Sequence, residues 1–137
     1  MISLRWRTNN NVMAVKKRIN IDGSGENTLN PALYPALEHA TKIDLDMALA
    51  THGASIKRKN IETLLTSLQW LRINISAATP ESYLKIHQRD WLDRVIKITE
   101  LLVEAKHKYG FRNNKGLETT IGFQMIVTKD NFDDIVP

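Results

Sequence analysis

Residues 79–110 carry the pattern that most constrains how this chain can fold. Thr79 followed by Pro80 is typical of a helix N-terminus, and Gly110, directly after a basic turn, is typical of a helix C-terminus. A helix between these two signals would be about 45 Å long, because each helical residue adds about 1.5 Å. The pattern therefore predicts one long helix over residues 80–109.

The apolar side chains of this predicted helix cover a wide arc of its surface. Trp91, Val95 and Leu102 lie on one line, and further apolar residues flank that line on both sides. The arc spans about 220°, about twice what packing against one layer requires. One interpretation is a central helix covered by a second helix and a sheet, and the other is a subunit interface. The length of the helix favours the interface, and its apolar spacing suits a helix pair in a dimer.

Two further helices are predicted before it. Apolar residues recur at helical spacing over about residues 35–52 and again over about residues 55–74. On the second of these helices, Trp70 points away from the leucine stripe, among polar neighbours that include Lys59, with Ile73 near the edge. A chain terminus lying over the indole would explain this position. A partner-binding anchor would explain it equally, because tryptophan is enriched at binding hot spots.

The two ends of the chain predict a small sheet. Residues 2–8 alternate apolar and polar side chains, residues 12–21 are rich in Val and Ile, and residues 119–128 alternate again. The asparagines between the first two segments are typical of a turn, which indicates a hairpin. Three helices with a small antiparallel sheet from the chain termini make an α+β fold.

Length and composition indicate one folded domain. The chain has 137 residues, of which 42% are hydrophobic and 25% charged, and we expect residues 1–137 to form a single domain with a flexible acidic tail at residues 129–137. The chain has no cysteine, which excludes disulfides, thiolate catalysis and cysteine-bound metals. No segment approaches the roughly 20 apolar residues of a membrane span, and the N-terminus lacks the apolar core of a secretory signal. These features predict a cytoplasmic protein with no membrane partner.

No catalytic or ligand-binding motif stands out in the chain. The four histidines are scattered, and no HExxH pair is present. The loop from Asp22 to Glu26 has two glycines, but it lacks the Lys-Ser/Thr pair of a phosphate loop, and its acids would repel phosphate. We therefore predict no enzymatic activity, no cofactor and no metal.

Three basic clusters support an alternative function. Their members are Arg5 and Arg7, then Lys16, Lys17 and Arg18, and finally Lys57, Arg58 and Lys59. Phosphate contacts require only that cations lie within reach. The net charge of +4 is modest, however, and a helix-turn-helix alignment fails because Lys59 falls at a position that should be apolar. Nucleic-acid binding is therefore the second hypothesis.

The first hypothesis is a non-enzymatic protein-interaction or assembly domain that self-associates through the long third helix. Its partner would be another protein or a second copy of the chain, with a homodimer favoured. The predicted contact residues are Trp70, Ile73, Lys59, Trp91, Val95 and Leu102. The alternative is a small nucleic-acid-binding regulatory protein that uses the basic clusters within residues 5–18 and 57–59.

Overall fold

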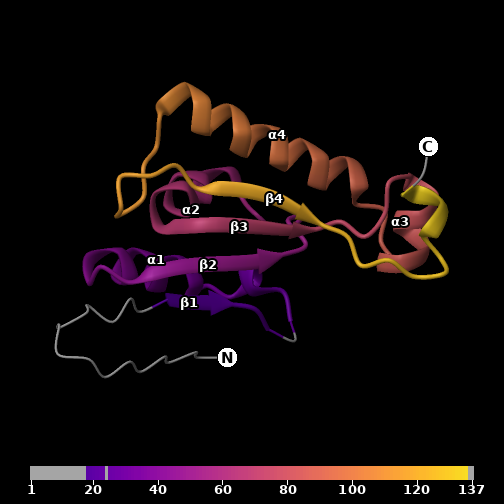
Figure 1. Cartoon of the computed structure of the whole chain (residues 1–137), viewed down its shortest axis with the longest axis horizontal. Helices are drawn as coiled ribbons and strands as arrows, with labels where there is room; N and C mark the ends of the chain where they lie inside the picture. Colours follow the sequence, from indigo (N-terminus) through magenta and orange to yellow (C-terminus); the bar gives the residue numbers. More distant parts are fainter. Residues whose placement is uncertain (1–17, 24, 136–137) are drawn as a thin grey trace, which may run out of the picture.

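The computed structural model describes residues 18–23 and 25–135, which form one four-stranded sheet and four helices (Figure 1). The strands are β1 (Arg18–Ile21), β2 (Asp46–Thr51), β3 (Leu68–Asn74) and β4 (Thr120–Gln124). The helices are α1 (Leu33–Lys42), α2 (Ile61–Ser67), α3 (Pro80–His87) and α4 (Leu92–Tyr109). Three short 3-10 turns accompany them: η1 (Asn27–Leu29), η2 (Arg58–Asn60) and η3 (Phe132–Asp134).

The sheet is entirely parallel, and its strands lie in chain order, β1-β2-β3-β4. Each connection therefore steps to the next strand in the same direction. Because crossovers between parallel strands are right-handed, steps in one direction place all the crossover helices on the same face. Helices α1, α2 and α4 pack in this way, and none of the described helices lies over the other face (Figure 1).

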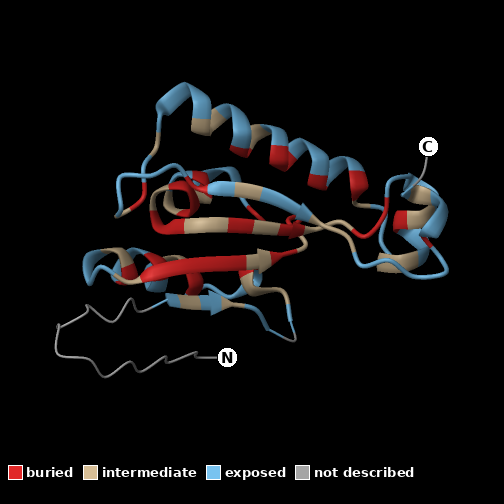
Figure 2. Cartoon of the chain, viewed as in Figure 1, coloured by how far each residue is buried: buried red, intermediate tan, exposed pale blue. Residues whose placement is uncertain are grey.

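The core lies between the sheet and these three helices. Leu49 of β2 and Leu71 and Ile73 of β3 are at most 1% exposed and pack in one cluster with buried residues of the helices. Strand β2 is buried along almost its whole length, β3 alternates buried with half-buried residues, and β4 is mostly exposed (Figure 2). Strands β2 and β3 therefore form the centre of the sheet, and β4 forms one edge.

The predicted α+β fold with an antiparallel sheet and three helices is wrong, because the protein has an α/β arrangement of four helices and four parallel strands. Two of the strands lie inside segments predicted to be helical. In the segment 35–52, helix α1 ends at Lys42 and β2 begins at Asp46. A strand of a parallel sheet that is buried on both faces is a continuous apolar run, which matches a helical pattern as well as a strand pattern.

The predicted helix over residues 55–74 is a short helix followed directly by a strand. Helix α2 ends at Ser67, and β3 starts at Leu68. The leucines of α2 and β3 together fit a helical spacing, although the structure gives residues 70–74 a period of two. Trp70 points away from Leu71 and the other leucines. That direction indicated a strand, because neighbouring side chains of a strand point to opposite faces.

The predicted long helix is correct at its two ends and wrong in its middle. Thr79 caps α3 by accepting a hydrogen bond from the backbone N–H of Ser82, and Gly110, with φ of 60°, ends α4. Between the two helices, Gln88 takes a left-handed conformation with φ of 54°, and the chain turns before Leu92. The break shortens α4 to 18 residues, about 27 Å, which a domain of this size accommodates.

The three strands predicted at the chain ends differ in outcome. Residues 2–8 and 12–17 lie outside the described part of the chain, while residues 18–21 of the second predicted strand form β1. The third predicted strand is present as β4, but it pairs in parallel with β3.

The acidic C-terminal segment is bound to α3 and to the residues that precede it. The carboxylate of Asp134 accepts hydrogen bonds from the backbone N–H of Ala78 at 2.8 Å and from the hydroxyl of Ser82 at 2.5 Å, and Asp130 lies 2.8 Å from the Lys85 ammonium. None of the helices in the described ranges combines the length and the apolar character that crossing a membrane requires.

Candidate binding surface

One face of the sheet has no described helix over it, and we call it the helix-free face. Its residues alternate with the core residues along each strand. They are Arg18 and Asn20 on β1, Ala48 and Ala50 on β2, Trp70, Arg72 and Asn74 on β3, and Thr120, Gly122 and Gln124 on β4. All-parallel sheets are almost always covered on both faces. In the described part of the chain, helices cover one face only, and on the other face Ala48 is buried and Trp70 is half-buried.

Trp70 and Arg72 form the centre of the helix-free face. Trp70 lies beside Ala48 in the sheet register, where the small side chain leaves room for the indole. The guanidinium carbon of Arg72 lies 5.3 Å from the centre of the Trp70 ring, within the range of a cation–π interaction. The Arg72 guanidinium also donates a hydrogen bond of 3.1 Å to Asp22. Both side chains are half-buried, and the contacts with Trp70 and Asp22 hold the guanidinium of Arg72 in place.

The structure separates the other residues that we predicted to contact a partner. Ile73, Val95 and Leu102 are each 0% exposed in the core of the chain. Lys59 is exposed in η2, and Trp91 is half-buried before α4, with its ring 5.6 Å from the ring of His52. Of the six predicted contact residues, only Trp70 lies on the helix-free face.

Part of the third basic cluster meets the C-terminal end of α4. A groove of about 540 Å³ brings together cations and aromatic rings from segments far apart in the sequence, namely Arg58, Lys59, Lys108, Tyr109 and Phe111. The ring of Tyr109 lies 5.5 Å from that of Phe111 and 5.3 Å from the Lys108 ammonium. Tyr109 is exposed and Phe111 is half-buried, and an exposed aromatic ring beside cations suits a stacked base and its phosphates.

Other members of the basic clusters are more dispersed. Arg18 is exposed on β1 and Lys57 is exposed before η2, whereas Arg5, Arg7, Lys16 and Lys17 lie outside the described residues. Glu62 and Glu104 line the same groove as Arg58 and oppose the binding of an anion.

Glu26 ties the loop after β1 to the end of β2. Its Oε1 accepts hydrogen bonds from the backbone N–H of Thr28 at 3.1 Å and from the hydroxyls of Thr28 and Thr51. Its Oε2 accepts from the backbone N–H of His52 at 3.0 Å and lies 3.1 Å from Nε2 of that residue. Burial by itself raises the pKa of Glu26, but the hydrogen bonds outweigh burial and hold the pKa below its usual value.

His52 uses both of its ring nitrogens in this arrangement. Nδ1 accepts a hydrogen bond of 3.0 Å from the backbone N–H of Ala54, while Nε2 faces Glu26. Because Nδ1 accepts, we assign the neutral ring a proton on Nε2, which is donated to the carboxylate. A general base needs a free nitrogen within reach of the substrate. The pair of Glu26 and His52 therefore fixes a loop and is not arranged for proton transfer.

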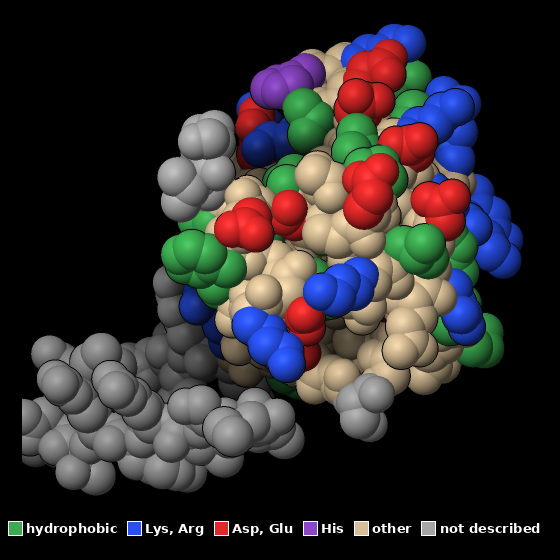
Figure 3. All heavy atoms as spheres, turned by 90° about the vertical axis from the view of Figure 1, so that its right-hand side faces the viewer, with side chains coloured by type: hydrophobic (Ala, Val, Ile, Leu, Met, Phe, Trp, Pro, Cys, Tyr) green, Lys and Arg blue, Asp and Glu red, His purple; other side chains and the backbone are tan. Residues whose placement is uncertain are grey.

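The end of the molecule at which the strands finish carries charges of both signs. In the view of that end, acidic side chains lie across the middle, and Lys and Arg side chains lie below them and along the right-hand border (Figure 3). Within residues 18–23 and 25–135, no three His, Asp or Glu side chains meet as a metal site would require.

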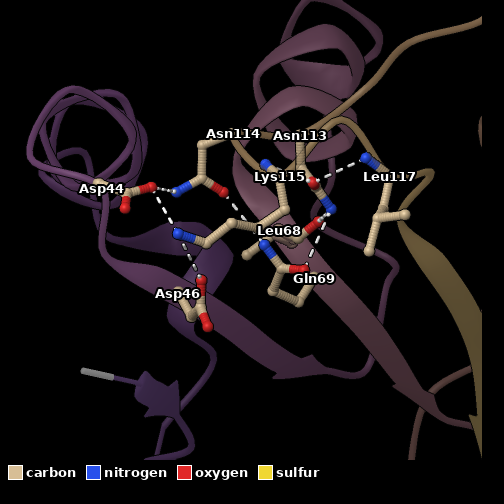
Figure 4. Close-up of polar contacts among 8 residues, drawn as sticks. All are labelled: Asp44, Asp46, Leu68, Gln69, Asn113, Asn114, Lys115 and Leu117. Atoms are coloured by element: carbon tan, nitrogen blue, oxygen red, sulfur yellow. Dashed lines mark hydrogen bonds and ion pairs between the residues drawn. The ribbon is translucent and has the colours of Figure 1, made fainter. Parts of the chain in front are cut away.

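A polar network closes the opposite end of the sheet (Figure 4). The Lys115 ammonium contacts Asp44 and lies 3.6 Å from the buried carboxylate of Asp46. Asn114 donates to Asp44 at 3.2 Å and accepts from Gln69 at 3.1 Å. The hydrogen bond to Asp44 and the nearby acidic charges raise the pKa of Lys115, although loss of hydration acts in the opposite direction. The network joins the loop before β4 to the turn before β2.

In comparisons with known proteins, no family model, no curated protein and no solved structure matches the chain. The helix-free face and Glu26 were both missed from the sequence. The face could have been found from the period of two in residues 70–74, whereas Glu26 has no signal beyond its place in a polar loop.

Proposed function

We propose that the chain is a non-enzymatic protein-interaction module that binds its partner through the helix-free face. The observation that carries this proposal is an all-parallel sheet with described helices on one face and Trp70 at the centre of the other. Tryptophan and arginine are the residues most enriched among binding hot spots, and here they lie stacked on one strand. The closed arrangement around His52 also supports a binding role rather than a catalytic one.

The first partner to consider is a second copy of the chain. Two sheets pack face to face at about 10 Å, and twofold dimers are the commonest assemblies. Ala48, Ala50 and Gly122 are small enough to permit that approach, and the ion pair with Asp22 reduces repulsion between the Arg72 residues of two copies. Val95 and Leu102, which we predicted to form an interface on the long third helix, are buried in the core, so we propose the sheet as the interface instead.

Replacing Trp70 with alanine is expected to raise the Kd of self-association at least about 30-fold, since loss of a central aromatic anchor costs about 2 kcal/mol. Sedimentation equilibrium measures the effect, with the wild type moving toward twice 15.7 kDa as its concentration rises. Leu84→Ala is the matched control, because Leu84 is a large apolar residue exposed on α3.

A wild-type chain that remains at 15.7 kDa up to high micromolar concentration would exclude the second copy as partner. The interaction module then requires a different protein. Captured proteins that bind W70A as well as the wild type would contradict the proposed surface.

The groove between α2 and α4 supports nucleic-acid binding as a second candidate function, because it joins Arg58 and Lys59 to the exposed ring of Tyr109. Binding of a labelled single-stranded oligonucleotide should weaken at least about tenfold when Tyr109 becomes alanine. Glu104→Gln should strengthen it, and Trp70→Ala should leave it unchanged. An affinity that none of these changes affects would remove the groove from consideration.

A further inference from the structure

The two edges of the sheet differ in how they are protected. Edge strands in natural proteins usually carry charges or proline, which prevent other strands from pairing with them. Strand β1 contains Arg18 and is followed directly by Asp22. At the other edge, residues 119–128 around β4 contain no Asp, Glu, Lys, Arg or Pro. Strand β4 pairs with β3 on one side, and no described strand pairs with its other side.

The backbone of β4 offers hydrogen bonds to that open side. The carbonyl of Gln124 accepts from the N–H of Ile75, so the backbone groups of Gln124 point toward β3. Because the direction alternates along a strand, the N–H and C=O groups of Ile121 and Phe123 point away from β3. These are the groups with which an additional strand would pair.

An apolar hollow lies beside this edge, between β4 and α4. Its volume is about 600 Å³, and it is lined by apolar side chains of both elements, including Ile96, Val103 and Phe123. These three large apolar residues are 40%, 38% and 56% exposed. Side chains on the helix side of an added strand would fill the hollow.

The charges around the hollow indicate the chemistry of the occupant. Glu100 and Glu104 are the only charged residues that line it within the described ranges. Antiparallel pairing of β4 with β4 of a second copy would bring the same acidic residues of both copies toward each other, which is unfavourable. An extended segment with lysine or arginine among its helix-facing side chains would neutralise them.

We propose that the β4 edge is a strand-addition site for an extended protein segment whose side chains toward α4 alternate apolar and basic residues. The backbone of that segment pairs with Ile121 and Phe123, its apolar side chains fill the hollow, and its cations reach Glu100 and Glu104. This surface is separate from the helix-free face, so the two proposals can fail independently.

The test uses the full chain and a fluorescein-labelled peptide of about eight residues, the usual length of a strand. The peptide has threonine at every second position, and the positions between the threonines alternate valine and lysine. We expect saturable binding by fluorescence anisotropy. Upon binding, the amide hydrogens of Ile121 and Phe123 should exchange with solvent at least about tenfold more slowly, because they become hydrogen-bonded.

Two substitutions separate the components of the site. Phe123→Pro removes an outward N–H and should raise the Kd at least about tenfold, whereas Phe123→Leu keeps that N–H and an apolar side chain and should bind nearly as the wild type does. Glu100→Lys leaves the strand intact and should reverse the preference, so that a peptide with glutamate in place of lysine binds better. Leu84→Lys, on the exposed surface of α3, is the control.

Three outcomes would overturn the proposal. One is binding with no added protection of the Ile121 and Phe123 amides. Another is equal affinity of the wild type for the lysine and glutamate peptides. The third is a wild-type dimer that dissociates with Phe123→Pro but persists with Trp70→Ala, because a second copy would then occupy the edge.

Discussion

Replacement of Glu26 by glutamine is expected to lower the free energy of unfolding by about 3 kcal/mol. Glutamine has nearly the same shape, but its amide group donates where the carboxylate accepted. The hydroxyls of Thr28 and Thr51 and the backbone N–H of His52 would then compete for one oxygen. Hydrogen bonds to a buried charged group contribute about 1.5–3 kcal/mol, and the unsatisfied donors add to the loss. Urea denaturation monitored by circular dichroism measures the change.

The same carboxylate predicts how stability depends on pH. The folded pKa of Glu26 lies below the ordinary value of 4.5, so its contribution to stability is complete above pH 4.5. As pH falls through the folded pKa, the carboxylate is protonated in the folded state as well, and the contribution is lost. The difference in stability between the wild type and Glu26→Gln should therefore shrink below pH 4.5.

Glu104→Gln is the control for both measurements, since Glu104 is exposed on α4 and forms no ion pair among the described residues. Its unfolding free energy should stay within about 0.5 kcal/mol of the wild type at every pH. If Glu26→Gln behaves as this control does, the hydrogen bonds around Glu26 contribute little to the fold.

The helix ends were predictable from the sequence because their signals are local. Thr79 with Pro80, and Gly110 after a basic turn, depend on side chains within one turn of the helix. The break near Gln88 also has a local sign, a run of polar residues from His87 to Asp90, but apolar spacing on both sides of it outweighed that sign.

Strands β2 and β3 could not be separated from helices by periodicity alone. Buried parallel strands lack alternation, so residues 46–51 carry no pattern that distinguishes them from a helix. In β3 the alternation exists, and Trp70 opposite Leu71 reveals it, but the adjoining leucines of α2 extend a helical spacing into the strand. Parallel pairing involves residues more than twenty positions apart, and no local signal encodes it.

The proposed binding surface could be predicted from the sequence only in part. Trp70 was identified because an indole among polar neighbours needs an explanation, and that argument holds for a strand as well as for a helix. Val95 and Leu102 were predicted to lie in an interface because a single helix over residues 80–109 would be longer than the neighbouring elements that could cover it. The shorter α4 carries both residues and packs over the sheet, where both are buried within the chain (Figure 1).

Gly53→Ala is expected to lower the free energy of unfolding by about 2–3 kcal/mol. Gly53 follows β2 with φ of 83°, a conformation that costs an alanine about 1 kcal/mol. A Cβ atom there would also lie 3.2 Å from Cγ2 of Ile73 and 3.6 Å from Cγ1 of Val95. Both neighbours are fully buried, so relieving the contact requires a shift of β3 or α4, at a cost of about 1–2 kcal/mol.

Two other glycines separate these contributions. Gly116 has φ of 70° with no atom near the added Cβ, so Gly116→Ala should cost about 1 kcal/mol from the backbone alone. Gly122 on β4 has neither constraint, and Gly122→Ala should be neutral or slightly stabilising. Urea midpoints at an unchanged m-value rank the three variants. If Gly53→Ala costs no more than Gly116→Ala, the turn after β2 does not pack against Ile73 as closely as the structure shows.

A displaced β3 would also move Trp70, so Gly53→Ala should weaken partner binding at temperatures where it remains folded.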